Sequence, residues 1–229
     1  MKHFFLCALA LCSIGYGHAQ TKSQLSAAET GQLFPPAVKA RYGITFPVFR
    51  AFTYTDRSGT FYVLLTEAPD TIIHEQGQAP DTLHHAIKAI CLQANGQAFT
   101  KNWEINDFIN REAEETNILF WGKYCAFTDV DGDGLADPFI VYSTWGINHL
   151  DDGRTKIILY YKGQKVAIRH QNSITDDGRV MEVDQAFYAL PATVQQQGRA
   201  ILQKLVDHHE TYPPAGWQMA MDQHTTKIR

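Results

Sequence analysis

The chain has 229 residues, with 20 Lys and Arg against 24 Asp and Glu, and a net charge of −4. This length suits one domain with a substantial core. The positive charges are scattered and form no basic run, which argues against nucleic acid as a partner, and the aromatic content of 12% predicts a β-rich interior.

The N-terminus has the parts of a secretory signal peptide. A short basic region that contains Lys2 precedes an apolar run, and Ala19 is a small residue suited to cleavage. The apolar run is shorter than the roughly 20 residues that cross a bilayer, and no later segment approaches that length. The sequence therefore predicts a signal peptide over residues 1–19, and a periplasmic or secreted β-rich domain over residues 20–229 with no transmembrane segment.

The first half of this domain predicts a weak helical stretch, over residues 20–40, and then two β-hairpins. Aromatic and β-branched residues flank the turn signal Asp56–Gly59, which indicates the first hairpin. Asn95-Gly96 is the strongest short hairpin signal and indicates the second. The strands of these hairpins are expected at residues 46–55, 60–66, 85–93 and 97–105.

The second half predicts two more hairpins, an amphipathic helix and a polar tail. The helix is expected over residues 193–209, after Pro191, and the tail after Met221. The strands are expected at residues 118–128, 138–144, 155–161 and 165–170. The fold class is therefore β-rich, all-β or α+β, as an antiparallel meander of about four hairpins with a C-terminal helix. A propeller-like repeat is the alternative, because the hairpins recur at even spacing.

The third hairpin carries an acidic loop that reads DVDGDGLAD. Its alternating aspartates can converge on one cation, Gly134 allows a sharp turn, and a backbone carbonyl can add another oxygen. Calcium takes six to eight hard oxygen ligands, and we therefore expect it as the cofactor. The expected ligands are Asp129, Asp131, Asp133, Leu135 (through its carbonyl) and Asp137. A metal-free acidic turn is the alternative, since Asp and Gly are common in turns.

The loop resembles the first nine positions of an EF-hand and departs from it afterwards. Ile140 occupies the position of the bidentate glutamate, and a strand pattern follows where the EF-hand has a helix. With Phe127 before the aspartates, the segment is more similar to the calcium loops of FG-GAP and VCBS-type extracellular β proteins. The missing glutamate predicts a weak site, with a Kd on the order of 10⁻⁴ to 10⁻³ M.

A wider stretch of the chain is similar to exported Bacteroidota proteins named for surface polysaccharide biosynthesis. The resemblance lies in residues 103–109, in the aspartate loop after Cys125 and in residues 155–161. It implies a binding or structural role linked to cell-surface glycan or an envelope protein, and it assigns no catalytic residue. Exposed Trp121, Trp145 or Tyr188 beside the loop would favour glycan contact.

A calcium-dependent glycan hydrolase is the alternative function. His149, Asp151 and Asp152, with His170 and Glu182 elsewhere, could supply acid–base chemistry, although the first three also read as an ordinary polar loop. Asp151 or Asp152 could also complete the calcium shell in place of the missing glutamate.

The cysteines leave a second question open. Cys91 and Cys125 remain after the signal peptide, and they form either a disulfide or two buried thiols.

Overall fold

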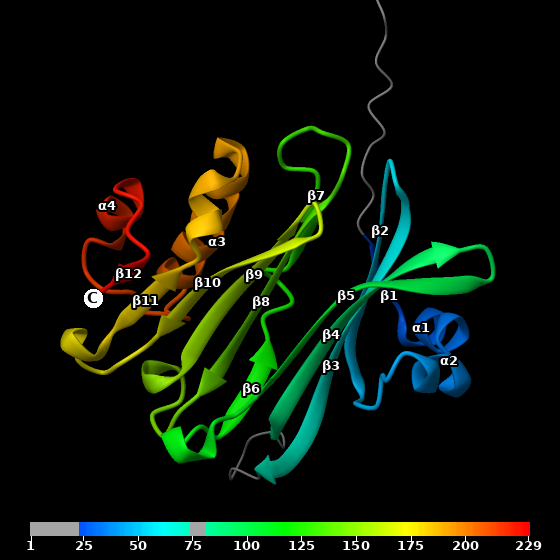
Figure 1. Ribbon diagram of the computed structural model, residues 1–229. Coiled ribbons are helices and arrows are strands. Elements are labelled where there is room, and N and C mark those ends of the chain that lie inside the picture. The colour runs from blue at the N-terminus through cyan, green and yellow to red at the C-terminus, as the bar shows by residue number, and fades with distance from the viewer. Residues whose placement is uncertain (1–22, 74–80) are drawn as a thin grey trace, which may run out of the picture.

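The computed structural model describes residues 23–73 and 81–229, and the predicted signal peptide lies outside them. Two antiparallel sheets stack face to face, and helices cover the outer face of each (Figure 1). The predicted β-rich fold class is therefore confirmed, in its α+β form. Within the described ranges, every helix is too short or too polar to cross a membrane.

Sheet A is a meander whose strands lie in chain order, β1-β2-β3-β4-β5. Both hairpins predicted for the first half are confirmed, and the second turns at the positive-φ Gly96. The strands are β1 (Ser23–Leu25), β2 (Val48–Asp56), β3 (Gly59–Ile73), β4 (Asp81–Asn95) and β5 (Ala98–Phe108).

Sheet B has the order β12-β11-β10-β9-β8-β6, and β7 also pairs with β8. Its strands are β6 (Asn117–Phe120), β7 (Ala126–Thr128), β8 (Asp137–Trp145), β9 (Arg154–Tyr161), β10 (Gln164–Gln171), β11 (Val180–Val183) and β12 (Lys227–Ile228). The fourth predicted hairpin is confirmed as β9 and β10. Short 3-10 turns, η1 (Arg111–Ala113), η2 (Leu150–Asp152), η3 (Asp176–Gly178) and η4 (Gln185–Ala189), lie in the connections.

The third hairpin differs from its prediction, because the strand expected over residues 118–128 is two strands. The Trp121 N–H donates to the Val141 carbonyl at 2.9 Å, and the chain then leaves β8 in a turn that the Tyr124 N–H closes onto the Trp121 carbonyl. It returns at Ala126, so that β6 and β7 pair with opposite ends of β8.

The N-terminal helices and the amphipathic helix lie where the sequence indicates them. The N-terminal stretch forms α1 (Ala27–Leu33) and α2 (Pro36–Arg41), and the predicted amphipathic helix is α3 (Ala192–Asp207). A further helix, α4 (Trp217–Asp222), follows. The polar tail expected after Met221 is wrong: Ile228 is buried and pairs with Met181 as the edge of sheet B. One apolar residue in a polar segment was too weak a signal to reveal this strand.

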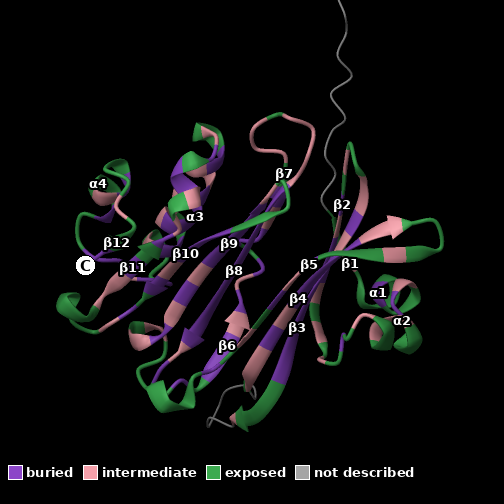
Figure 2. Cartoon of the chain, in the orientation of Figure 1, coloured by how far each residue is buried: buried purple, intermediate pink, exposed green. Residues whose placement is uncertain are grey.

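Three apolar layers hold these elements together. The largest lies between the sheets, a second between sheet B and α3 with α4, and a third between sheet A and the N-terminal helices. Buried residues accordingly run along the middle strands of both sheets (Figure 2). Strand β8 is buried on both faces, since it lies at the centre of the molecule. Two stacked sheets of this size are not the separate four-stranded blades of a propeller.

Buried or half-buried polar side chains also connect sheet A to sheet B, and sheet B to the segment that joins the two sheets. Glu67 on β3 accepts the backbone N–H of Phe120, on the edge strand β6, at 2.9 Å. Arg154 on β9 donates to both carboxylate oxygens of Glu115, at 2.5 and 2.6 Å. These contacts satisfy groups that would otherwise be buried without partners.

The two cysteines are buried thiols, so the structure favours that alternative over a disulfide. The Tyr54 hydroxyl lies 3.7 Å from the Cys91 sulfur, and the Cys125 sulfur accepts the Val141 N–H at 3.4 Å.

Candidate metal centre

The acidic loop runs from the end of β7 at Thr128 to the start of β8 at Asp137. Gly132 and Gly134 both have positive φ values, 78° and 84°, which side-chain-bearing residues rarely adopt. These glycines let the chain coil tightly enough to turn its aspartates inward.

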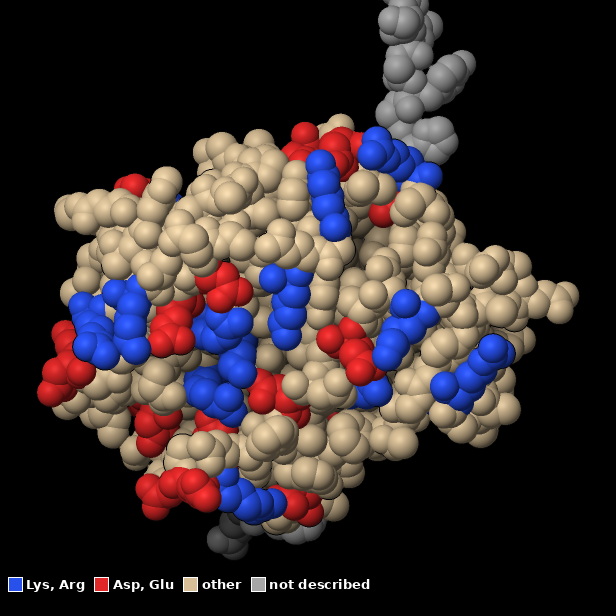
Figure 3. Space-filling model, viewed as in Figure 1, with Lys and Arg blue, Asp and Glu red and all other residues tan. Residues whose placement is uncertain are grey.

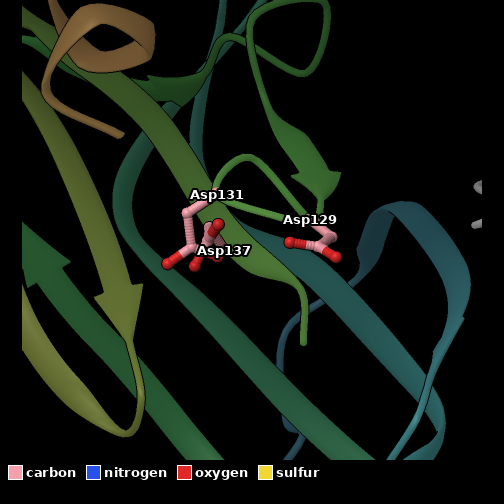
Figure 4. A group of neighbouring side chains, drawn as sticks. All are labelled: Asp129, Asp131 and Asp137. Carbon is pink, nitrogen blue, oxygen red and sulfur yellow. The ribbon is translucent and has the colours of Figure 1, made fainter. Parts of the chain in front are cut away.

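The loop gathers three carboxylates at one point. One oxygen from each of Asp129, Asp131 and Asp137 lies within 4.8 Å of the others. Figure 4 shows the three side chains near one another where β8 begins. Asp137 is buried, with only 2% of its surface exposed, whereas the other two are partly exposed. This group could hold a metal ion.

Asp129 organises the loop around itself. Its carboxylate accepts the backbone N–H groups of Gly132, Asp133 and Gly134, at 2.8, 3.1 and 2.7 Å. Asp137 similarly accepts the Val130 N–H at 2.9 Å. Backbone N–H groups of the loop therefore hold the Asp129 and Asp137 carboxylates in place.

The surroundings of Asp137 disfavour its charged form. Burial raises the pKa of Asp137 to about 6, and repulsion from the other loop aspartates adds to this effect. A bound cation would reverse both effects, because it attracts the charged form that burial and neighbouring carboxylates disfavour.

One predicted ligand, Asp133, lies outside this group of carboxylates. Asp133 faces Lys162, whose Nζ lies 2.8 Å from its Oδ2, and this hydrogen bond holds the pKa of Asp133 below its usual range. The Leu135 N–H donates to Asp133 at 2.8 Å, and a role for the Leu135 carbonyl stays a prediction.

Neighbouring hairpins hold the loop on two sides. The Tyr161 hydroxyl donates to Asp131 at 2.8 Å, from the β9–β10 hairpin whose tip carries Lys162. From sheet A, Asp56 accepts the Ala136 N–H at 3.0 Å, and the Arg57 N–H donates to the Gly134 carbonyl at 3.0 Å. Sequence reasoning missed these contacts, because pairing across two sheets leaves no local signal.

The other residues singled out in the sequence do not join this site. His149, Asp151 and Asp152 follow the C-terminal end of β8, whereas Asp137 begins it, and nine strand residues span about 26 Å. The expectation that Asp151 or Asp152 completes the metal shell is therefore wrong. Asp152 instead accepts the N–H of Asn148 at 3.1 Å within its own loop.

The remaining acid–base candidates and aromatics are also dispersed. His170 is buried, which lowers its pKa to about 4, and Glu182 pairs with Lys227 at the surface. Tyr188 is buried, and Trp121 is half-buried on the α3 side of sheet B. Trp145 ends β8, far from the loop. None of these three aromatics offers an exposed face beside the aspartates.

A scan against protein-family models, a search of curated proteins and a search of solved structures found no match. Function must therefore be inferred from the residues themselves.

Proposed function

We propose that the Asp129–Asp137 loop binds calcium and that the ion stabilises the contact between the two sheets. The convergence of Asp129, Asp131 and Asp137 within 4.8 Å carries this proposal. The same loop donates one hydrogen bond to the β2–β3 turn of sheet A and accepts another from it. An ion held there would stiffen the point at which both sheets meet the loop.

Calcium suits this donor set better than a softer metal. All of the candidate ligands are oxygens, and calcium tolerates the irregular geometry that a flexible loop provides. Asp133 would enlarge the shell if it rotated from Lys162 toward the ion. The need to break that ion pair is a further reason to expect weak binding.

The proposed setting is the cell envelope or the extracellular space. The signal-peptide pattern supports export, and a weak site is useful only where calcium is abundant. The similarity to exported Bacteroidota proteins named for surface polysaccharide biosynthesis supports a binding or structural role toward surface glycan. In this role the ion is structural and the glycan is bound elsewhere on the molecule.

A calcium titration of the chelator-treated protein tests the proposal. Calorimetry should give a Kd on the order of 10⁻⁴ to 10⁻³ M, with weaker binding of magnesium. Millimolar calcium should then add about 1 kcal/mol to the free energy of unfolding, which is a rise of about 2–4 °C in Tm.

Substitutions locate the ion. Asp131→Asn and Asp137→Asn should each abolish the calcium-dependent rise in Tm, whereas Asp177→Asn, at an exposed acidic residue in η3, should keep it. No heat and no change in Tm for the unmodified chain would show that the loop is a metal-free acidic turn.

A further inference from the structure

Sheet A leaves part of the inner face of sheet B uncovered. The apolar layer between the sheets reaches Ala167 on β10 and includes no residue of β11 or β12. Beyond it, the side chains on this face are half-buried or exposed and mostly polar, with the half-buried Val180 among them. We call this surface the β9–β11 shelf. It comprises Arg154, Lys156, Lys165, Arg169, Gln171 and Glu182.

Strand register places these side chains on one face. Lys156 pairs with Arg169, which pairs with Glu182, and Arg154 pairs with Gln171. Alternate residues of a strand share a face, so Lys165 joins them four residues before Arg169. All of the shelf residues except Lys165 line a hollow of about 340 Å³. Lys and Arg side chains gather over this part of the molecule (Figure 3).

The shelf cations are only partly neutralised. Lys156 lies 2.6 Å from Asp107, Arg154 pairs with Glu115, and Arg169 lies 2.5 Å from Asp184. Lys165 has no ion pair with any residue in the described ranges.

Lys165 lies near both positive and negative side chains. Partial burial lowers its pKa, and the nearby Arg169 and Lys156 lower it further, against the opposing effect of Asp107 and Asp184. A ligand anion would relieve this repulsion.

The mixture of charges selects the kind of anion. Glu182 and Asp184, between the cations, would repel a densely charged chain such as nucleic acid. The same carboxylates can accept hydrogen bonds from hydroxyl groups, while Arg169 can hold a carboxylate through its planar fork. Sparse acid groups and many hydroxyls are the chemistry of an acidic saccharide.

We propose that the β9–β11 shelf binds a saccharide that carries carboxylate groups. This proposal rests on the glycan-binding role proposed above and names its ligand class and its place. The acid groups lie on Lys165 and Arg169, and the sugar hydroxyls donate to the carboxylates beside them.

Calorimetry on the full chain with saturating calcium tests the shelf. The probes are oligosaccharides that contain glucuronic or sialic acid, each compared with its carboxyl-reduced counterpart, together with inorganic sulfate and single-stranded DNA. At least one acidic oligosaccharide should bind about tenfold more tightly than its reduced form, than sulfate and than DNA.

Variants then place the ligand. Lys165→Gln and Arg169→Gln should each weaken binding of that oligosaccharide about tenfold, while Lys204→Gln, on the exposed side of α3, should leave it unchanged. Lys165 makes no ion pair with the residues that the structure describes, so its variant should keep the Tm of the unmodified chain.

The proposal would be overturned by equal binding of acidic and reduced sugars, by full binding to both shelf variants, or by no binding of any acidic oligosaccharide. Preferential binding of sulfate or DNA would also overturn it, because the site would then recognise charge alone. Calcium titration is measured separately, so loss of the metal proposal is distinguishable from loss of the shelf.

Discussion

The Ala136 backbone N–H donates to the Oδ2 atom of Asp56 at 3.0 Å, and this bond helps to join the first hairpin of sheet A to the acidic loop of sheet B. Asp56 also accepts the Ser58 N–H at 2.7 Å, through its other oxygen. The Asp56 carboxylate therefore stabilises both the β2–β3 turn, to which it belongs, and the acidic loop.

Replacement of Asp56 should weaken both the fold and the metal site. Asp56→Ala leaves two backbone N–H groups without their acceptor, which should lower the free energy of unfolding by about 1–2 kcal/mol. Calcium affinity should fall as well, since the loop loses its support from sheet A. Urea unfolding and calorimetry measure the two effects, and Asp177→Ala provides the matched control. An Asp56 variant with unchanged calcium affinity would show that the loop is independent of sheet A.

Lys162 should compete with calcium for Asp133. It occupies a hairpin tip in the left-handed conformation, with φ 49°, followed by Gly163 with φ 80°. Lys162→Asn creates the Asn-Gly turn that this geometry favours and removes the ion pair. Calcium should then bind about three- to tenfold more tightly by calorimetry. Lys204→Gln should change nothing, and weaker binding in the Lys162 variant would contradict a ligand role for Asp133.

Glu67 should make stability depend on pH. Burial raises its pKa to about 7, well above that of an unfolded glutamate, so the folded state keeps a proton that the unfolded state loses. Its contribution is therefore most favourable below about pH 4.5 and is lost as pH rises to about 7. Glu67→Gln still accepts the Phe120 N–H, and it should raise stability at pH 8 by up to about 3 kcal/mol while changing little at pH 4.

The neighbouring His84 should change stability with pH in the opposite direction, so its contribution must be measured with a variant of its own. Its Nε2 lies 3.7 Å from Glu67, and burial lowers its pKa, so its contribution improves as pH rises through its titration. Melting curves of Glu67→Gln and His84→Gln between pH 4 and 8 separate the two. Parallel curves for Glu67→Gln and the unmodified chain would contradict the raised pKa.

Two helical glycines should respond in opposite ways to alanine. A Cβ at Gly198 on α3 would lie 2.9 Å from the buried Phe187 ring, whereas a Cβ at Gly31 on α1 would meet nothing within 4 Å. Gly198→Ala should cost about 1–2 kcal/mol despite its better helix propensity, and Gly31→Ala should gain about 0.5–1 kcal/mol. Denaturant unfolding of both measures the difference. Stabilisation of both variants would mean that α3 can move away from Phe187.

Local patterns were enough to predict most of the fold. Turn residues and alternating side chains located all four hairpins, and the apolar spacing of residues 193–209 located α3. They did not predict the elements whose position depends on residues far away in the chain. The interruption between β6 and β7 begins after the Trp121–Val141 hydrogen bond, where the chain turns at Tyr124. Strand β12 exists because Ile228 packs in an apolar layer made by earlier strands.

The candidate site was predictable in its residue types and only partly in its geometry. Alternating aspartates with two glycines indicated the loop, and three of them converge. Asp133 does not join them, because the β9–β10 hairpin places Lys162, 29 positions later in the chain, beside it. No spacing within the loop could have shown this competition.

Each sheet is built from one continuous half of the chain. Sheet A uses residues 23–108 and sheet B residues 117–228, with only the short η1 connection between them. During synthesis the first half can complete its hairpins before the second half emerges, since its strand pairs are all sequential neighbours. The apolar inner face of sheet A then stays uncovered until sheet B has formed. The molecule is thus divisible at residues 109–116 into two fragments that should reassemble by covering each other.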